Sequence, residues 1–331
     1  MEVKLTSQVG QNRLLLHEAV PLETPLVIYV EPSGFCNLKC GFCPHGTASS
    51  GLKKAMMPVD LFCKMIDEIE KFPKKIKMMR VCGNGEPLIN PCLVDMLSYA
   101  SLKMVAEKTE LITNAVLLTP ELIEQLPRHL TRIVCSIEGL SDDEYLRICG
   151  TRVDFSALIR NIDALYTTRG DCILHVKINH EAVTSSEKEA RFFALFKDKC
   201  DEMFIEKIVP MWPQMETTFS VNEFRWGDEA ITPRRVCAQI FKGVQVQADG
   251  EVVPCCVDWS RVNVIGNLYE SSLPEIWRSK SLRKLQLAHL SGEKGSLDPC
   301  KGCCMNDYCE VDNLDDYADE CIRRLTQWEN L

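Results

Sequence analysis

The sequence has 331 residues, with 38 basic and 47 acidic side chains, and its formal net charge is −9 at neutral pH. A chain this acidic has no basic surplus for neutralising phosphates, so we expect no nucleic-acid partner. No apolar run approaches the length of a membrane-spanning helix and the N-terminus has no signal-peptide pattern, so we expect no membrane partner and a cytoplasmic location.

Buried strands alternate with amphipathic helices between residues 26 and 209, and five helical crossovers would join six strands. This alternation predicts an α/β fold with a parallel sheet and outer helices, although the pattern alone does not separate a barrel from an open sheet. The predicted strands are 26–32, 76–83, 109–114, 131–139, 172–180 and 202–209. The predicted helices are 59–72, 91–102, 119–126, two that start near 141 and 155, and 185–199.

The character of the chain changes after residue 209. Residues 210–235 are polar and rich in proline, which predicts a linker. Alternating residues around Asp249-Gly250 predict a hairpin over 243–256, and helices are predicted over 273–290 and 314–330. We therefore divide the chain into an N-terminal extension (1–25), an α/β domain (26–209), a linker (210–235) and a small α+β domain (236–331).

Eighteen cysteines is a high number for this length. Without an export signal, metal or redox chemistry explains them better than a disulfide framework. Three follow the first predicted strand as C-x3-C-x2-C, at Cys36, Cys40 and Cys43. A zinc site would need a fourth donor, for which His45 is the candidate. A 4Fe–4S cluster on three thiolates would instead leave one iron open to a ligand.

Later motifs favour the cluster. The triplet has an aromatic residue, Phe42, before its third cysteine, and the second strand is followed by Gly83-Asn84-Gly85-Glu86-Pro87. These features resemble the cysteine motif and the G-G-E-P motif of the radical SAM enzymes. The resemblance implies a partial (β/α)6 barrel, S-adenosylmethionine (SAM) bound to the open iron, a 5′-deoxyadenosyl radical that abstracts hydrogen from substrate, and a reductant such as flavodoxin or ferredoxin.

Further motifs of that family assign the cofactor contacts. "LITNA" is similar to the third-strand motif, with Ala115 where glycine is usual, and "CSIEG" is similar to the fourth-strand motif, with Glu138 where aspartate is usual. Lys177 and Asn179, on the fifth strand, either face the pocket or lie on a solvated face. The resemblance implies these SAM contacts: Phe42, Gly83, Asn84, Gly85, Glu86, Asn114, Ser136, Glu138 and Arg152.

The second domain carries another cysteine pattern. Cys237 and Cys255 flank the predicted hairpin, and Cys300-x2-Cys303 follows it, an arrangement that resembles the SPASM/twitch extension of radical SAM enzymes. The resemblance implies an auxiliary 4Fe–4S cluster on these four thiolates. The longer two-cluster pattern is broken at Asn313. A second auxiliary cluster with Cys309 and Cys321 stays open as the alternative, and Cys256, Cys309 and Cys321 are candidate hydrogen-atom donors.

The motifs define the chemistry more closely than the substrate. Our first prediction is oxidation or epimerisation of a small polar substrate, such as a sugar or cyclitol, because the auxiliary cysteine spacing is similar to that of a twitch enzyme that acts on an aminocyclitol. The first alternative is maturation of a ribosomally made peptide or protein. Only residues 1–25 precede the first strand, too few for the leader-binding domain of many such enzymes.

The second alternative is a non-catalytic iron–sulfur electron-transfer protein, although such a carrier needs no open iron. Residues 210–235, with Trp212, Arg225 and Trp226, either line the substrate or only link the domains.

Overall fold

The computed structural model describes residues 3–5, 14–47, 51–209, 211–212, 215, 231, 233–309 and 311–328. Most of the segment 210–235, with Arg225 and Trp226, lies outside these residues. No helix in the described part of the chain is long and apolar enough to cross a membrane.

One sheet runs through the described residues, and its strand order is β1-β7-β6-β5-β4-β3-β2-β8-β9-β10. Strands β2 to β7 are parallel and lie side by side in chain order. Six parallel strands joined by helical crossovers confirm the predicted α/β class. The strands are β1 Lys4–Leu5, β2 Val27–Val30, β3 Ile76–Val81, β4 Ala106–Thr113, β5 Arg132–Ile137, β6 Ile173–Asn179, β7 Glu202–Glu206, β8 Gly243–Val246, β9 Glu251–Val253 and β10 Gly266–Asn267.

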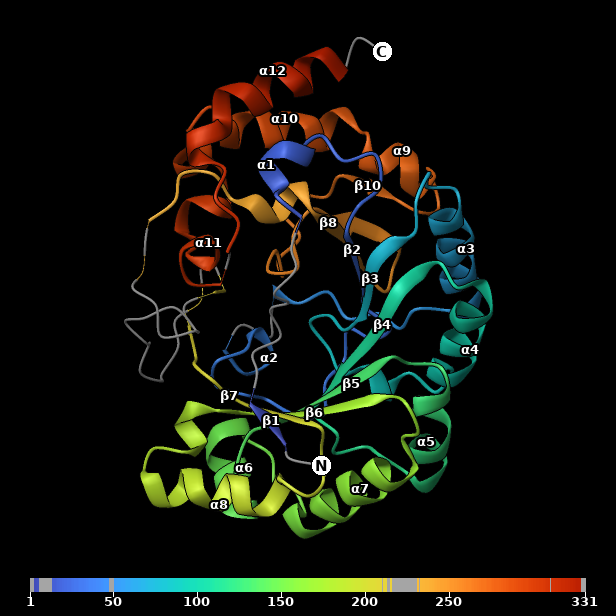
Figure 1. Cartoon of the computed structure of the whole chain (residues 1–331), viewed down its shortest axis with the longest axis vertical. Coiled ribbons are helices and arrows are strands. Elements are labelled where there is room, and N and C mark those ends of the chain that lie inside the picture. Colours follow the sequence, from blue (N-terminus) through green and yellow to red (C-terminus); the bar gives the residue numbers. More distant parts are fainter. Residues whose placement is uncertain are drawn as a thin grey trace.

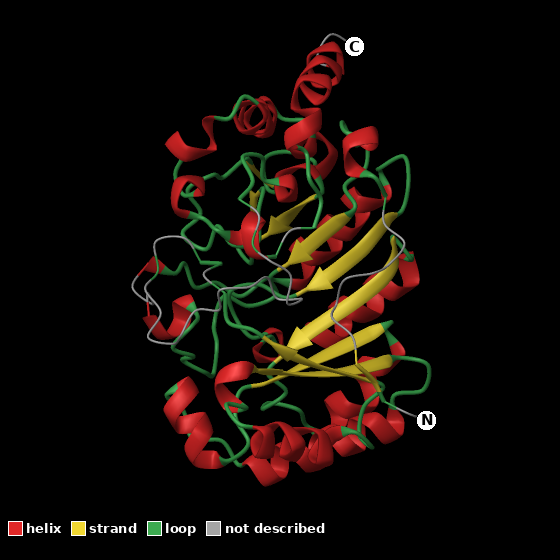
Figure 2. Cartoon of the chain, turned by 60° about the vertical axis from the view of Figure 1, so that its left-hand side comes forward, coloured by secondary structure: helices red, strands yellow, loops and turns green. Residues whose placement is uncertain are grey.

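The sheet curves, and the crossover helices cover its outer side (Figure 1). The arrowheads of the parallel strands all point toward the side where the long loops gather (Figure 2). In β/α barrels this carboxyl-terminal edge carries the chemistry. The helices are α1 Leu16–Ala19, α2 Pro44–Thr47, α3 Val59–Glu70, α4 Leu93–Lys103, α5 Pro120–Gln125, α6 Asp142–Cys149, α7 Phe155–Thr168, α8 Ser186–Phe196, α9 Leu273–Trp277, α10 Lys280–Leu290, α11 Met305–Tyr308 and α12 Ala318–Trp328.

The helix predicted over 273–290 is two helices, α9 and α10. Ser272 forms a capping box with Glu275 at the start of α9. The Ser279 side chain then accepts a hydrogen bond from the Leu282 N–H at the start of α10. Such caps satisfy the first N–H groups of a helix. The apolar periodicity continued across both helices and did not reveal the break.

The sheet extends beyond the expected α/β domain on both sides. From the N-terminal extension, β1 pairs in parallel with β7. From the C-terminal region, β8 pairs in parallel with β2, and β9 turns back antiparallel to β8. A Cβ at Gly243 would lie 2.0 Å from the Val27 carbonyl oxygen, so a side chain there would push β8 off β2. The predicted hairpin therefore continues the barrel sheet.

Candidate functional site

The three-cysteine loop follows β2 at the carboxyl edge of the sheet. The last turn of α6 holds it: the Lys39 N–H donates to the Cys149 carbonyl (2.9 Å) and the Gly41 N–H to the Ile148 carbonyl (3.0 Å). Within the loop, the Cys43 N–H donates to the Cys40 carbonyl at 3.0 Å. These contacts fold eight residues into a compact turn with all three thiols half-buried.

The three thiols influence one another electrostatically. Burial, and then the charges of Glu86 and Cys40, raise the pKa of Cys36 to about 12. Burial and then Cys40 also raise the pKa of Cys43. Thiolates gathered in a buried loop need a compensating cation, which coordinated iron supplies. The donor set therefore fits an iron–sulfur cluster.

The glycine-rich loop after β3 packs directly on the cysteine loop. A Cβ at Gly85 would lie 2.2 Å from the Ser33 carbonyl oxygen, and one at Gly83 would lie 2.6 Å from the Glu31 side chain. The Glu86 N–H donates to the Phe35 carbonyl at 2.8 Å. Both glycines are therefore needed for this close approach, which the motif alone did not explain.

Glu86 joins the loops at this edge. Its Oε1 accepts from the Thr113 hydroxyl (2.6 Å) and the Leu88 N–H (3.0 Å), and its Oε2 accepts from the Asn114 N–H (2.8 Å). The Asn114 side chain then donates to the Asn37 side chain at 2.8 Å. Burial raises the pKa of the Glu86 carboxyl, and these hydrogen bonds oppose that effect. Glu86 thus orders the loops after β2, β3 and β4, whatever contact it makes with a ligand.

Ala115 occupies a position that favours glycine. Its φ is 60°, in the left-handed region that glycine adopts at least cost. The backbone conformation therefore accounts for the usual glycine of the motif, and this chain keeps the conformation with alanine.

A cavity of about 350 Å³ lies at the carboxyl edge, between the barrel strands and the C-terminal region. Its lining contains Trp212 of the predicted substrate segment and two candidate hydrogen donors, Cys256 and Cys309. The predicted cofactor and cluster residues in the lining are Phe42, Cys43, Gly83, Ser136 and Glu138, together with Lys177 and Asn179 of β6.

Other predicted residues lie outside this lining. Arg152 is exposed and its nearest ion-pair partner is Asp143, at 3.4 Å. His45 is buried and hydrogen-bonded to the Asn84 backbone, which opposes the lowering of its pKa by burial. No three His, Cys, Asp or Glu side chains in the described ranges are arranged to hold a single metal ion.

One wall of the cavity is strongly polar. The Asn179 side chain donates to Glu138 Oε2 at 2.6 Å, and Lys177 Nζ lies 2.5 Å from Glu206 Oε2. Burial raises the pKa of Glu138 to about 7, against the hydrogen bond from Asn179 and the charge of Lys177. Glu138 therefore titrates near neutral pH and can accept or donate a hydrogen bond to a bound hydroxyl group.

Another part of the lining was not predicted from the sequence. It contains Tyr29, Arg80, Cys82 and Gln245 beside Cys256. Arg80 lies over the Tyr29 ring, 5.6 Å from its centroid, and its Nε is 2.6 Å from Glu110 Oε1. A hydrogen bond from Cys255, and then the charge of Arg80, lower the pKa of Cys256. The two-residue period of the strands could have indicated Tyr29 and Arg80, but not that β8 lies beside them.

A second, smaller cavity of about 30 Å³ lies within the C-terminal region, and all four predicted auxiliary cysteines line it: Cys237, Cys255, Cys300 and Cys303. Burial, and then the charge of Cys303, raise the pKa of Cys300 to about 12. Four buried thiols around one cavity fit a closed 4Fe–4S cluster. Cys309 lines the larger cavity instead. Cys321 lies in the apolar cluster around α12, with its Sγ 3.9 Å from the His17 carbonyl oxygen.

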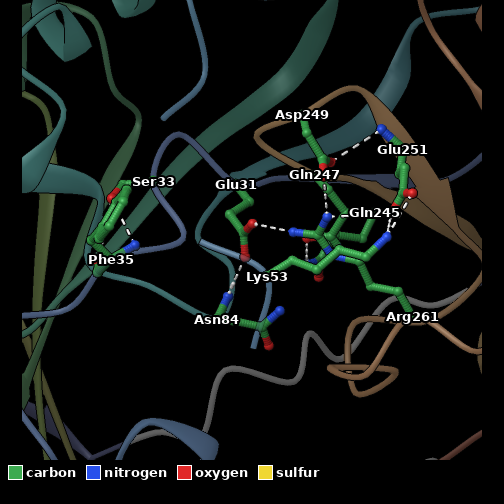
Figure 3. A network of polar contacts seen from close by, with 10 residues as sticks. All are labelled: Glu31, Ser33, Phe35, Lys53, Asn84, Gln245, Gln247, Asp249, Glu251 and Arg261. Atoms are coloured by element: carbon green, nitrogen blue, oxygen red, sulfur yellow. Dashed lines mark hydrogen bonds and ion pairs between the residues drawn. The ribbon is translucent and has the colours of Figure 1, made fainter. Parts of the chain in front are cut away.

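A buried ionic network connects the two regions (Figure 3). Arg261 follows the auxiliary cysteine Cys255 and is 1% exposed; its guanidinium lies 3.2 Å from Glu31 Oε1 and 2.5 Å from Asp249 Oδ2. Glu31 Oε2 accepts a hydrogen bond from the Asn84 N–H at 2.8 Å. The network therefore joins the hairpin turn to the glycine-rich loop.

Comparison with known proteins identifies the class. The family model of the radical SAM superfamily matches residues 30–182, and that of the SPASM iron–sulfur cluster-binding domain matches residues 237–304. These matches contain the cysteine triplet and the four cysteines of the smaller cavity. The protein is therefore an iron–sulfur enzyme, and it belongs to the radical SAM superfamily with a C-terminal SPASM region.

Two curated proteins resemble most of the chain. The tungsten-containing aldehyde ferredoxin oxidoreductase cofactor-modifying protein of Pyrococcus furiosus is 25% identical, over 86% of this chain and 88% of that protein. The mycofactocin maturase MftC of Mycobacterium tuberculosis is 24% identical, over 86% of this chain and 79% of that protein. The crystal structure of Streptococcus suis SuiB bound to the precursor peptide SuiA shares the fold, with a TM-score of 0.59 and 16% identity over 91% of this chain and 74% of that one.

The family determines the cofactors. They are SAM, a 4Fe–4S cluster that binds it, and auxiliary iron–sulfur clusters. When bound, the SAM-ligated cluster supplies the 5′-deoxyadenosyl radical that abstracts hydrogen from a substrate.

Proposed function

We propose that this enzyme is a maturase that oxidises a peptide or a peptide-derived cofactor precursor. In this proposal Cys36, Cys40 and Cys43 hold the SAM-binding cluster, and the four cysteines of the smaller cavity hold one auxiliary cluster. The maturation alternative replaces small-molecule oxidation as our first choice, because the two curated relatives that cover most of the chain are named as a maturase and a cofactor-modifying protein.

The position of the larger cavity is the observation that carries the proposal. Its lining contains both Cys43 and Cys256, the neighbour of the auxiliary cysteine Cys255. A substrate in this cavity lies between the two thiol sites. With both groups bound, the site on Cys36, Cys40 and Cys43 would supply the 5′-deoxyadenosyl radical that removes a hydrogen atom from a substrate C–H bond. The site on Cys237, Cys255, Cys300 and Cys303 would accept the remaining electron, and one proton would leave to solvent. The net change is a two-electron oxidation.

The polar wall has a role in this scheme. Glu138, Asn179 and Lys177 stand close together on β5 and β6, and their hydrogen bonds hold the carboxylate and amide in fixed orientations. Fixed polar groups orient a bound molecule at little entropic cost. We propose that Ser136 and Glu138 face the SAM ribose, while the wall formed by Tyr29, Arg80 and Gln245 faces the substrate.

The test uses synthetic peptides encoded by small reading frames beside the gene. The reconstituted enzyme is incubated with each peptide, SAM and dithionite, and mass spectrometry follows the peptide and 5′-deoxyadenosine. We expect one peptide to lose 2 Da with stoichiometric 5′-deoxyadenosine, and deuterium from that peptide to enter 5′-deoxyadenosine. If every peptide stays unmodified while SAM is cleaved, the maturase proposal fails.

Oxidation or epimerisation of a small polar substrate is the second candidate. The cavity of about 350 Å³ has the size of a small-molecule site, and its polar wall suits hydroxyl groups. A panel of sugars and cyclitols in the same assay separates the candidates, because deuterium transfer from one of these compounds and from no peptide would favour this function.

A further inference from the structure

His289 of α10 has no role in the proposed function described so far, but the groups around it indicate one. The ring is completely buried, with 0% exposure. It lines the same cavity as Cys237, Cys255, Cys300 and Cys303. It is therefore a buried polar group beside the proposed auxiliary cluster.

One hydrogen bond identifies the tautomer of His289. Its Nδ1 accepts from the Cys237 N–H at 3.4 Å, so the ring proton of a neutral imidazole is on Nε2. The Nε2–H group is thus a hydrogen-bond donor.

This donor has no acceptor among the residues that the structure describes, since His289 Nε2 is buried there without a hydrogen-bond partner. Leaving a buried donor unpaired costs free energy, so native structures rarely do so without a reason. The cavity that His289 shares with the four thiols offers an acceptor of the right kind once a cluster is bound. The sulfurs of such a cluster accept hydrogen bonds from neighbouring groups.

Two other side-chain nitrogen donors line this cavity, and both already have partners. The Asn263 side chain donates to the Asp298 carbonyl at 3.1 Å. Lys294 is the second of them. Its Nζ donates to the Cys303 carbonyl at 3.0 Å and to Asn306 Oδ1 at 2.8 Å. Its positive charge adds to the local field, but its hydrogen bonds hold the backbone around Cys303. Of these three donors, His289 is the one that lacks an acceptor.

We propose that His289 Nε2–H donates a hydrogen bond to a sulfur of the auxiliary cluster and thereby raises its reduction potential. A donor to sulfur stabilises the reduced cluster, which carries one more negative charge. The auxiliary cluster then accepts an electron from a substrate radical more readily. The inference rests on the auxiliary site of the proposed function and is independent of the substrate.

Two substitutions separate the two ring nitrogens. His289→Asn keeps an acceptor near the position of Nδ1, for the Cys237 N–H, but removes the donor at Nε2. His289→Gln returns an N–H group to the position of Nε2. Each is made in the full chain with Cys36, Cys40 and Cys43 replaced by alanine, so that only the auxiliary cluster contributes to the signal of a redox titration followed by electron paramagnetic resonance.

We expect about tenfold less reduced cluster in His289→Asn than in the parent at one fixed potential, which is a shift of about 59 mV for a one-electron couple. His289→Gln should recover most of this loss. Equal potentials in the parent and in His289→Asn, each with a full complement of iron, would overturn the inference.

If a His289 variant fails to bind iron, the proposal can still be tested on the parent protein, without a substitution at His289. In the parent labelled with ¹⁵N-histidine, pulsed electron paramagnetic resonance should detect coupling between the reduced cluster and one histidine nitrogen. A reduced cluster without that coupling contradicts the hydrogen bond. A parent that retains no iron contradicts the auxiliary site itself, and a negative peptide assay contradicts only the maturase function.

Discussion

The two thiol sites differ in how the chain builds them. The cysteine triplet comes from one loop of eight residues, and its last member, Cys43, faces the cavity of about 350 Å³. The auxiliary thiols come from segments far apart in the sequence and surround about 30 Å³ of space. A local loop leaves one side of its cluster open to a ligand, whereas thiols gathered from several segments enclose theirs. The difference supports the proposal that one site starts the reaction and the other passes electrons.

Removing the open site should have the largest effect. The triple replacement of Cys36, Cys40 and Cys43 by alanine should abolish 5′-deoxyadenosine formation, because no other group can bind SAM to iron. Iron analysis should find about four residual irons for one auxiliary cluster. About eight residual irons would instead support two auxiliary clusters. Cys63→Ala, on the outer helix α3, is the matched control and should retain both activity and iron.

Removing the closed site should separate SAM cleavage from product formation. Cys300→Ala takes away one of four thiolates, so we expect loss of the auxiliary cluster and of oxidised product while 5′-deoxyadenosine still forms. Parallel quantification of both products by mass spectrometry checks this. Cys304→Ala removes the thiol next to Cys303 and should leave the ratio of the two products unchanged. If the rate of SAM cleavage and the yield of oxidised product fall together in Cys300→Ala, the two sites do not have separate roles.

Breaking the buried ion pair between Arg261 and Glu31, which connects the two regions, should lower the free energy of unfolding. Arg261→Met leaves the fully buried Glu31 carboxylate without its cation, and loss of one partner from a buried ion pair costs about 3–5 kcal/mol. Urea unfolding should report this loss. Glu31→Gln combined with Arg261→Met should be more stable than Arg261→Met alone, because the double variant buries no unpaired charge at position 31. Equal stability of the two variants would show that Glu31 does not depend on Arg261.

The smallest expected effect concerns Glu138, which lines the cavity between the sites. Its carboxyl group should make the free energy of unfolding depend on pH. Burial raises the pKa of Glu138 from its ordinary 4.5 to about 7, so the folded state binds more protons than the unfolded state between these values. Stability should therefore fall as the pH rises from about 4.5 to about 7. Glu138→Gln should remove this slope in urea midpoints measured across that range, and an unchanged slope would assign it to other groups.

Sequence patterns predicted those parts of the molecule that are encoded within short segments of the chain. The parallel alternation of strands and helices, the cysteine triplet and the glycine-rich loop each occupy a short segment, so periodicity and spacing reveal them. The pairing of β8 with β2 and the contact of Arg261 with Glu31 join residues more than 200 positions apart, and no local period encodes them. The exposed position of Arg152 beside Asp143 was not evident from the motif either, and its contact with a cofactor stays a prediction.

The pairing of β8 with β2 has a consequence for synthesis on the ribosome. β2 is made early, yet one of its two neighbours, β8, begins only at Gly243. Until then the nascent barrel carries an unpaired strand edge, the kind of surface that invites association with other chains. A chain released after residue 209 should therefore aggregate unless a chaperone covers that edge. The hairpin of β8 and β9 thus completes the sheet of the barrel, in addition to belonging to the region of the auxiliary cysteines.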